Sequence, residues 1–403
     1  MDDSKQLKKQ IIIVGGGSRG LAFTRMLTQD LGREVAAIVD NHVAGHEAIR
    51  FRLEAYGLPH VPVYKDVDDA IAEIPRSQAD TMFIMTPEWT HIDIFRKAVD
   101  NGFHIFLEKP LATTLEDTNE IMALAKKTDQ VVQVGFVLRY TAFYQKIKEL
   151  ADRNTIGKIM IIQMNERLGL QHGATFKRSW HRLHRYTGGF MNEKCTHDLD
   201  LMCWMKEKQS YPVEVSSFGG VSHATDLDTP LNCSDCELEC PWRFRDFASD
   251  KSINGKSYND DTFAPLGQCV FHSDSDVNDH QTVSIRFADG TQGIFTAISV
   301  SGMPGRDIVL HGTAGYIQGS LETGEITVHR YWEGTTERIE VGETDHHGGG
   351  DLAIVGSFLD CIAEGVKPLS TVAAGVRAGT IAFAADRSNR EGVNIRVEAA
   401  PES

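Results

Sequence analysis

The sequence contains no long apolar run. No stretch approaches the about 18 consecutive apolar residues that a membrane-spanning helix requires. The first ten residues mix acids and lysines, without the apolar centre of about 7 to 15 residues that a signal peptide carries. We therefore expect neither a membrane span nor a secretory signal.

Positive charge is also in short supply. The chain has 41 lysines and arginines against 56 aspartates and glutamates, which leaves a formal net charge of −15 at pH 7. Such an acidic surface repels phosphate backbones and anionic lipid headgroups. Nucleic acids and membranes are therefore not expected partners.

Cysteine is rare and odd in number, with seven residues in 403. That usage indicates reduced thiols in a cytoplasmic protein rather than a disulfide framework. Cys233, Cys236 and Cys240 nevertheless form a cluster with Cys-x2-Cys-x3-Cys spacing. The cluster is compatible with structural zinc, completed by Cys269 or a histidine such as His223, with a disulfide, or with free thiols. We predict no catalytic metal.

The first third of the chain has the pattern of a parallel sheet covered by helices. Short β-branched runs alternate with helical patterns, at 11–14, 35–39, 82–85, 104–107 and 131–134. A helix is predicted over 21–31, and another over 115–127 that opens with the capping pair Thr113 and Glu116. The alternation predicts a doubly wound α/β Rossmann domain over residues 9–130.

From residue 131 onward the pattern is that of an antiparallel sheet. Strands predicted at 283–287 and 294–300 flank an Asp289-Gly290 turn, and 316–328 hold another hairpin. Helical stretches follow at 351–363 and 372–389. We predict an α+β domain with a large, mainly antiparallel sheet over 131–403, interrupted by an irregular insertion at about 222–267.

A glycine-rich turn follows the first predicted strand and opens a helix. Gly15, Gly17 and Gly20 hold its first, third and sixth places, where a tight turn, close approach to a pyrophosphate and helix packing each need a glycine. Asp40 ends the next strand, 20 residues after Gly20, where a carboxylate can accept both ribose hydroxyls and repel a 2′-phosphate. The cofactor is therefore expected to be NAD rather than NADP.

Two later segments carry candidate catalytic residues. Lys109 comes just after the strand at 104–107, and the carboxyl ends of parallel strands border the ligand crevice of a doubly wound sheet. If residues from Met191 onward are helical, Glu193, His197 and Asp200 share one face. His197 suits general base work because an unperturbed imidazole titrates near neutrality.

Together these segments resemble the glucose-fructose oxidoreductase and inositol dehydrogenase family (Gfo/Idh/MocA). The resemblance covers nearly the whole chain and rests on the glycine turn, Thr86-Pro87 with His91, Glu108-Lys109-Pro110, and the stretch from Gly188-Gly189 to His197, Asp200 and Trp204. It implies an NAD(P)-dependent sugar or cyclitol oxidoreductase in which Lys109 touches nicotinamide and substrate, His197 is the acid/base, and Glu193 stands near it. The family more often has Asp where Glu193 stands, and Asn is common where Glu88 stands.

The candidate site residues form two groups. Those assigned to NAD by the motifs and the resemblance are Gly15, Gly17, Ser18, Arg19, Gly20, Asp40, Thr86, Pro87, His91, Glu108 and Lys109. Those predicted to contact substrate are Arg139, Tyr140, Trp180, His181, Arg185 and Asp200, with Asp198, His346 and His347 as further candidates. Aromatic faces stack on sugar rings and cations bind hydroxyls, although ordinary surface residues would give the same pattern around 180–186.

The leading hypothesis is an NAD-dependent dehydrogenase that transfers a hydride between a sugar, sugar-derivative or cyclitol hydroxyl and nicotinamide. An NAD-dependent glycosidase that works by transient oxidation and elimination is an alternative on the same fold. A non-enzymatic dinucleotide sensor is a second alternative, although a sensor needs no acid/base group beside the nicotinamide. The resemblance also implies a homodimer or homotetramer.

Overall fold

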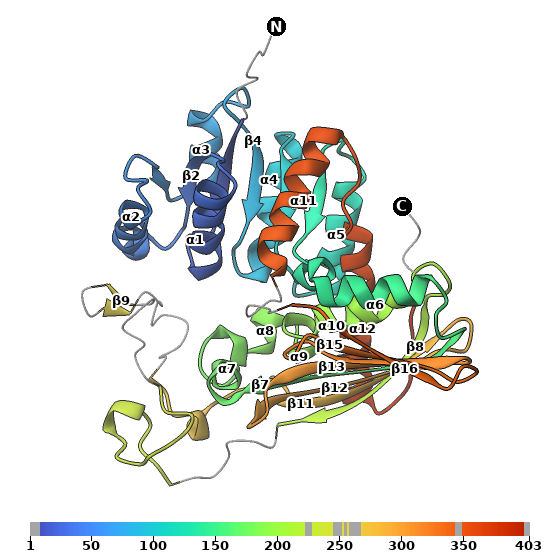
Figure 1. Cartoon of the computed structure of the whole chain (residues 1–403). Helices are drawn as coiled ribbons and strands as arrows, with labels where there is room; N and C mark the ends of the chain where they lie inside the picture. The colour runs from blue at the N-terminus through green and yellow to red at the C-terminus, as the bar shows by residue number, and fades with distance from the viewer. Residues whose placement is uncertain are drawn as a thin grey trace, which may run out of the picture.

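A computed structural model describes residues 9–221, 228–244, 252–253, 256–257, 267–342 and 349–398. The predicted residues His223, His346 and His347 lie outside this part. The chain forms two layered units, each built around one sheet (Figure 1).

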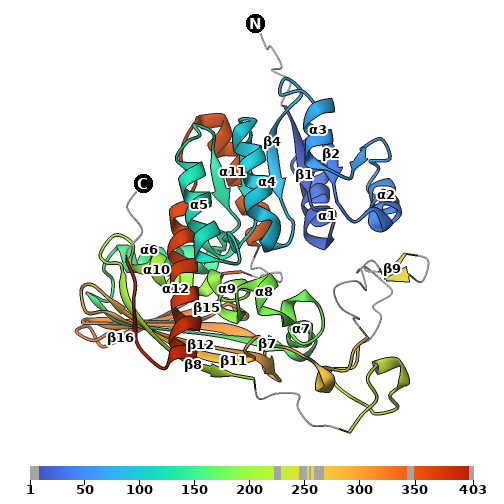
Figure 2. The same cartoon turned by 180° about the vertical axis from the view of Figure 1, so that it is seen from behind.

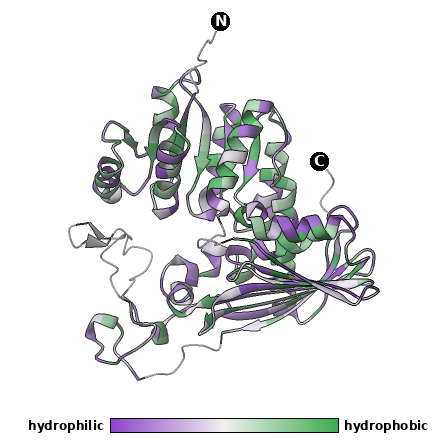
Figure 3. Cartoon of the chain, in the orientation of Figure 1, coloured by the Kyte–Doolittle hydropathy of each residue, from purple (hydrophilic) through white to green (hydrophobic). Residues whose placement is uncertain are grey.

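The first unit is a parallel six-stranded sheet in the order β3-β2-β1-β4-β5-β6. Its strands are β1 (Gln10–Val14), β2 (Val35–Val39), β3 (Val63–Tyr64), β4 (Ala79–Ile84), β5 (His104–Leu107) and β6 (Val132–Val134). Successive residues of β1 point into two different cores, Ile11 and Ile13 into one, Ile12 and Val14 into the other. Because both faces are covered, its strands read as continuous apolar runs, and Figure 3 shows hydrophobic colour along them.

The helices of this unit are α1 (Ser18–Arg25), continued by the π-helical segment Met26–Asp30, then α2 (His46–Ala55), α3 (Val67–Glu73), α4 (His91–Asp100) and α5 (Leu115–Ala125). The predicted capping pair of α5 was wrong by one residue. Thr114 is the N-cap, and its hydroxyl accepts a 3.1 Å hydrogen bond from the backbone N–H of Asp117. The sheet extends to Val134, past residue 130.

The second unit is a nine-stranded, mainly antiparallel sheet in the order β16-β15-β14-β13-β7-β12-β11-β8-β17, in which only β7 and β12 pair in parallel. Its strands are β7 (Ile159–Gly169), β8 (Pro212–Gly220), β11 (His280–Phe287), β12 (Gln292–Ser301), β13 (Gly305–Gly312), β14 (Gly315–Ser320), β15 (Glu325–Arg330), β16 (Thr335–Glu340) and β17 (Ile395–Arg396). Buried and exposed residues alternate along β11, so only one face is covered. The predicted fold class is confirmed.

Six further helices connect the two sheets or carry the site between them. They are α6 (Ala142–Asp152), α7 (Leu170–Thr175), α8 (His184–Thr187), α9 (Phe190–Glu193), α10 (Thr196–Lys206) and, after the second sheet, α11 (Gly350–Glu364). Within the insertion, the strands β9 (Ser252–Ile253) and β10 (Lys256–Ser257) form a separate pair.

The end of the chain returns to the first unit. Phe358 of α11 packs edge-on against Phe83 of β4 and Phe106 of β5, at 5.5 and 5.6 Å between ring centroids. The last helix, α12 (Val372–Glu391), then runs past both sheets (Figure 2). Val376 lies in the core of the first unit and Ile381 in the core that includes the second sheet. This shared helix holds the two units against each other.

Among the described residues, no helix is both long enough and apolar enough to span a bilayer. All seven cysteines lie in the described part and none of them is in a disulfide.

Candidate active site

The three predicted glycines do three different jobs in the turn between β1 and α1. A side chain at Gly15, whose φ is +103°, would stand 2.7 Å from the backbone of Met85, and one at Gly20 would stand 1.9 Å from the carbonyl oxygen of Gly15. Gly17, the N-cap of α1, has nothing within 4 Å of that position. The turn is therefore closed on its inner side and open at the helix N-terminus, where free N–H groups suit a pyrophosphate. These residues fit a dinucleotide.

Asp40 lies beside this turn, directly after β2. Its carboxylate accepts hydrogen bonds from the backbone N–H of Gly16 at 2.7 Å and of His42 at 2.9 Å. A carboxylate has about four acceptor positions, so two remain for ribose hydroxyls. The backbone bonds orient the group without using up its acceptor capacity.

Thr86, Pro87 and His91 follow β4 on the other side of the turn. The buried His91 ring has Nε2 2.8 Å from the carbonyl of Thr86, and Nδ1 3.0 Å from that of Pro110. Burial lowers the pKa of His91, against the effect of these carbonyls. The His91 ring thus links the loop after β4 to the loop that carries Lys109.

Arg19 and Glu108, both assigned to NAD by the sequence, contact each other. Arg19 Nε donates to Glu108 Oε1 at 2.7 Å, and its Nη1 lies 2.8 Å from Asp351 Oδ1. The second Glu108 oxygen accepts from the backbone N–H of Lys109 at 3.0 Å. The ion pair between Arg19 and Glu108, together with Asp351, therefore joins α1, the end of β5 and α11.

Lys109 reaches across from the first unit to the second. Its Nζ donates a 2.8 Å hydrogen bond to the backbone carbonyl of Glu193, at the end of α9. Burial lowers the pKa of the Lys109 ammonium, which the carboxylates of Glu108, Glu88 and Glu166 oppose. A lysine from one unit and the segment leading to His197 from the other are thus in contact.

The predicted helix from Met191 onward is broken, so Glu193 does not share one helical face with His197 and Asp200, which both remain in α10. The helix α9 ends at Glu193 and α10 begins at Thr196. Glu193 turns toward His181, whose Nδ1 it contacts through Oε1, while Oε2 is buried without a hydrogen-bond partner. His197 is buried in the first turn of α10, and its ring centroid lies 6.0 Å from that of Phe136, just past β6.

Family models match the chain over both units. The NAD-binding Rossmann fold of an oxidoreductase family matches residues 9–136, and the GFO/IDH/MocA C-terminal domain matches residues 144–318. The chain belongs to the Gfo/Idh/MocA oxidoreductase family. The predicted family, the dehydrogenase class and NAD as the cofactor are thereby confirmed.

Individual relatives are distant. YteT of Bacillus subtilis, an oxidoreductase by name, is 26% identical over 365 residues, 81% of this chain and 82% of YteT. The inositol 2-dehydrogenase/D-chiro-inositol 3-dehydrogenase of Lacticaseibacillus casei is 30% identical over 213 residues, 51% of this chain and 55% of the relative. Levoglucosan dehydrogenase, solved with NADH and levoglucosan, shares the fold with a TM-score of 0.75 at 18% identity, covering 98% of this chain and all of that one.

Two predicted substrate residues of this Gfo/Idh/MocA protein, Arg139 and Asp200, form an ion pair with each other. Arg139 donates to both carboxylate oxygens of Asp200, at 2.6 and 2.7 Å, and both side chains are buried. Tyr140 lies with its hydroxyl 3.2 Å from that of Ser370, and Arg185 is exposed with its guanidinium 4.9 Å from the Tyr186 ring centroid. Trp180 packs against His181, which contacts Glu193, whereas the other four make the contacts just described.

The sequence analysis did not predict a buried ionic network that joins β7, β13 and the segment around α10. Glu166 of β7 lies 3.0 Å from Lys194 Nζ and 2.5 Å from Arg306 Nη2, and Arg306 Nε donates to Asp198 at 3.0 Å. Burial raises the pKa of Asp198 well above its usual value, which Arg306 opposes. An inward-facing acid in an alternating strand could have signalled Glu166, but its partner Arg306 is 140 residues away.

Glu88 and Trp89, in the loop after β4, were also missed as site residues. The Glu88 side chain is buried and its Oε1 has no hydrogen-bond partner. Burial raises the pKa of Glu88 to about 7, which Lys109 opposes. Trp89 packs against Tyr186 and Trp180, at 4.8 and 5.9 Å between ring centroids. These three residues form an aromatic wall, to which the first unit contributes Trp89.

Proposed function

We propose that this protein is an NAD-dependent dehydrogenase of a sugar, sugar-derivative or cyclitol hydroxyl, with Lys109 and His197 as its acid-base pair. The names of the inositol dehydrogenase and levoglucosan dehydrogenase relatives support this class of substrate. The contact that carries the proposal is the hydrogen bond from Lys109 Nζ to the carbonyl of Glu193. It joins the loop after β5 in the first unit to the segment that leads into His197 in the second.

In this mechanism His197 takes the proton of the substrate hydroxyl, and returns it in the reverse direction. Lys109 stabilises the negative charge that develops on the oxygen, and does so strongly because the site is largely desolvated. Bound NAD supplies the hydride acceptor at its nicotinamide ring. Glu193 and His181 hold each other beside the reacting groups, which orients the loop between α9 and α10.

The aromatic wall supports a ring-shaped polar substrate. Trp89, Trp180 and Tyr186 pack together, and the buried Trp180 Nε1 has no acceptor within the described residues. An apolar ring face with a polar edge matches a sugar or cyclitol, which presents C–H bonds on its faces and hydroxyls at its rim.

Replacement of Lys109 or His197 tests the proposal. Lys109→Ala and His197→Asn should each lower kcat by about 10²- to 10³-fold, because each removes a group that acts on the reacting oxygen. Calorimetric NAD affinity should stay within about threefold, since the glycine turn and Asp40 are untouched. Lys127→Ala, an exposed lysine beyond α5, is the matched control.

Two results would contradict the assignment: unchanged turnover, or loss of NAD binding in folded variants. Turnover is followed as NADH accumulation with a panel of sugars and inositols. Aglycone release from glycosides without net NADH would support the glycosidase instead, and tight NAD binding without any turnover would support a sensor.

We also propose a homodimer or homotetramer formed through the open face of the nine-stranded sheet. Helices cover only one side of this sheet (Figures 1 and 2). On the other side Phe218 of β8 is 74% exposed, next to outward-facing residues of β11 and β12. Sedimentation equilibrium distinguishes the two assemblies from a monomer.

A further inference from the structure

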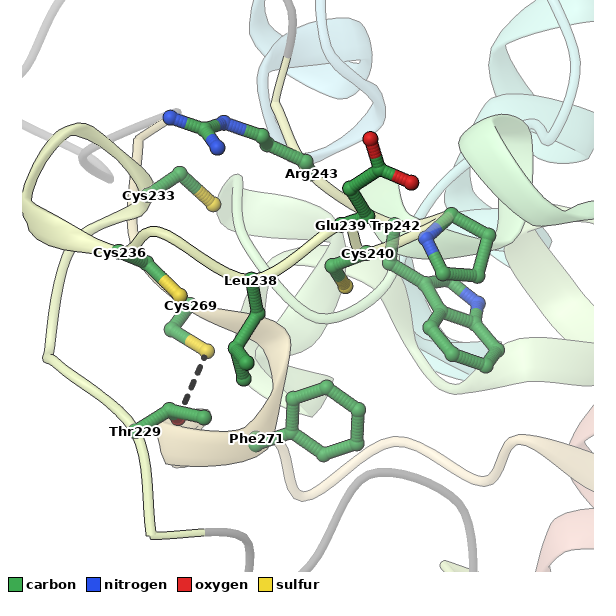
Figure 4. A pocket seen from close by; sticks show the side chains of 11 residues that line it. Thr229, Cys233, Cys236, Leu238, Glu239, Cys240, Trp242, Arg243, Cys269 and Phe271 are labelled. Carbon is green, nitrogen blue, oxygen red and sulfur yellow. Dashed lines mark hydrogen bonds between the residues drawn. The ribbon is translucent and has the colours of Figure 1, made fainter.

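Four of the seven cysteines surround one pocket in the insertion, away from the active site. Cys233, Cys236, Cys240 and Cys269 line a cavity of about 210 Å³ together with Trp242 and Phe271. Figure 4 shows the four side chains around this cavity, with Leu238 drawn between Cys240 and the other three. The fold thus adds Cys269 to the Cys-x2-Cys-x3-Cys cluster.

Backbone hydrogen bonds hold the two cysteine-bearing segments together. Cys233 N–H donates to the carbonyl of Gly267 at 2.7 Å, and Cys269 N–H donates to that of Leu231 at 2.8 Å. Cys236 follows Cys233 through a single 3-10 turn, Cys233–Asp235. Backbone hydrogen bonds therefore fix the positions of the two chain segments that carry these thiols.

A buried positive charge faces these thiols. Arg178 is only 3% exposed, and its guanidinium donates to the carbonyls of Gln268 and Trp242 and, at 3.5 Å, to the sulfur of Cys233. No carboxylate pairs with it among the described residues.

The guanidinium lies beside the thiols, so negative charge that develops on the sulfurs would be stabilised by it. A second donor, the backbone N–H of Phe244, also points at the sulfur of Cys233, at 3.5 Å. N–H donors that point at a sulfur are typical partners of metal-bound cysteines. Four thiolates on one divalent ion leave two negative charges, which Arg178 partly neutralises.

We propose that Cys233, Cys236, Cys240 and Cys269 bind one zinc ion as a tetrahedral four-thiolate site, with Arg178 as its counter-charge. Each thiol gives up its proton as its Zn–S bond forms, so no oxidant or reductant takes part. Zinc–sulfur bonds of about 2.3 Å require the sulfurs to stand about 3.8 Å apart. Among the described residues, no three or more such side chains are already arranged to hold a metal ion, so binding requires the four thiols to change rotamer toward the cavity.

The zinc site would link the two ends of the insertion and hold the segment that leads to Trp180 and His181. It joins the segment before residue 241 to Cys269, and both to Arg178. Arg178 precedes Trp180 and His181 by two and three positions. The proposal does not depend on the dehydrogenase activity, because the ion would be structural.

Elemental analysis of the full-length protein, purified without chelator after growth with zinc, tests the proposal. We expect about one zinc per chain in the wild type. Cys236→Ser and Cys240→Ser should reduce zinc at least fivefold. Cys361→Ser, which alters a buried cysteine of α11 far from the cluster, should keep the wild-type content.

A second measurement covers variants that fail to fold. A mercurial that titrates the thiols of wild-type protein should release zinc in step with modification of Cys236 and Cys240, read with a metal-sensitive dye and peptide mass spectrometry. The proposal is overturned by wild-type protein that holds no zinc even after anaerobic addition of zinc, or by a disulfide among these cysteines. Iron with inorganic sulfide, or equal zinc in all variants, would overturn it as well.

Discussion

Two sets of charged groups, Arg139 with Asp200 and Lys109 with the nearby Glu88, differ in how many of their polar atoms have partners. Arg139 donates to both oxygens of Asp200, and its remaining nitrogen donates to the carbonyl of Leu369 at 3.0 Å. Within the described part of the chain, Lys109 Nζ donates to one backbone carbonyl, and Oε1 of the nearby Glu88 is buried without a hydrogen-bond partner. A fully paired charge stabilises a fold, whereas a partly paired one keeps capacity for a ligand.

Removing half of the satisfied pair should give the largest effect on stability. Arg139→Met leaves the Asp200 carboxylate buried without its partner, and should cost about 3 to 5 kcal/mol of the free energy of unfolding. Denaturant unfolding at neutral pH measures this loss. Arg96→Met, in an exposed pair with Glu120, is the control and should lose less than about 1 kcal/mol. Equal losses in both variants would remove the contrast between buried and exposed pairs.

The unsatisfied carboxyl should reveal itself by the opposite behaviour. The pKa of Glu88 is raised to about 7 in the folded protein, so the folded state binds more protons than the unfolded state between about pH 4.5 and 7. Stability from this group is therefore present at low pH and declines as the pH rises through 7. Glu88→Gln removes the titration, and should be up to about 3 kcal/mol more stable, relative to the wild type, at pH 8 than at pH 5.

Urea unfolding of both proteins at pH 5 and pH 8 checks this difference. Glu120→Gln, an exposed carboxyl in the control pair, should show little pH dependence relative to the wild type. A Glu88→Gln protein that is destabilised equally at both pH values would mean that Glu88 is held by partners, like Asp200.

Local patterns made the first half of the site predictable, and long-range pairing limited the second half. The roles of Gly15 and Gly20 follow from a turn of six residues, so the motif alone determines them. The break between α9 and α10 could not be predicted, because helical periodicity continues through Lys194 and Cys195 while the backbone does not. Glu193 consequently meets His181 rather than the next turn of its own helix.

The pairing of Arg139 with Asp200, 61 residues apart, was missed for a related reason. Side-chain type showed that both residues carry charge, and order along the chain placed both near the site. Nothing in either observation shows that the two charges face each other. Candidate substrate residues are therefore less predictable from sequence than cofactor residues, whose geometry is set by the backbone.

Glu193 is the intermediate case, with one oxygen on His181 and the other without a partner. His181→Phe keeps an aromatic ring against Trp180, whose centroid lies 4.4 Å away, but removes the nitrogen that orients Glu193. Because His181 is itself only partly buried, we expect at most a small fall in the melting temperature and a fall of about tenfold in kcat/KM, about 1.4 kcal/mol. His181→Gln retains a hydrogen-bond donor and should therefore recover part of the loss in kcat/KM. Equal losses in the two variants would contradict the orientation of Glu193 by His181, and would indicate that the imidazole contacts the substrate directly.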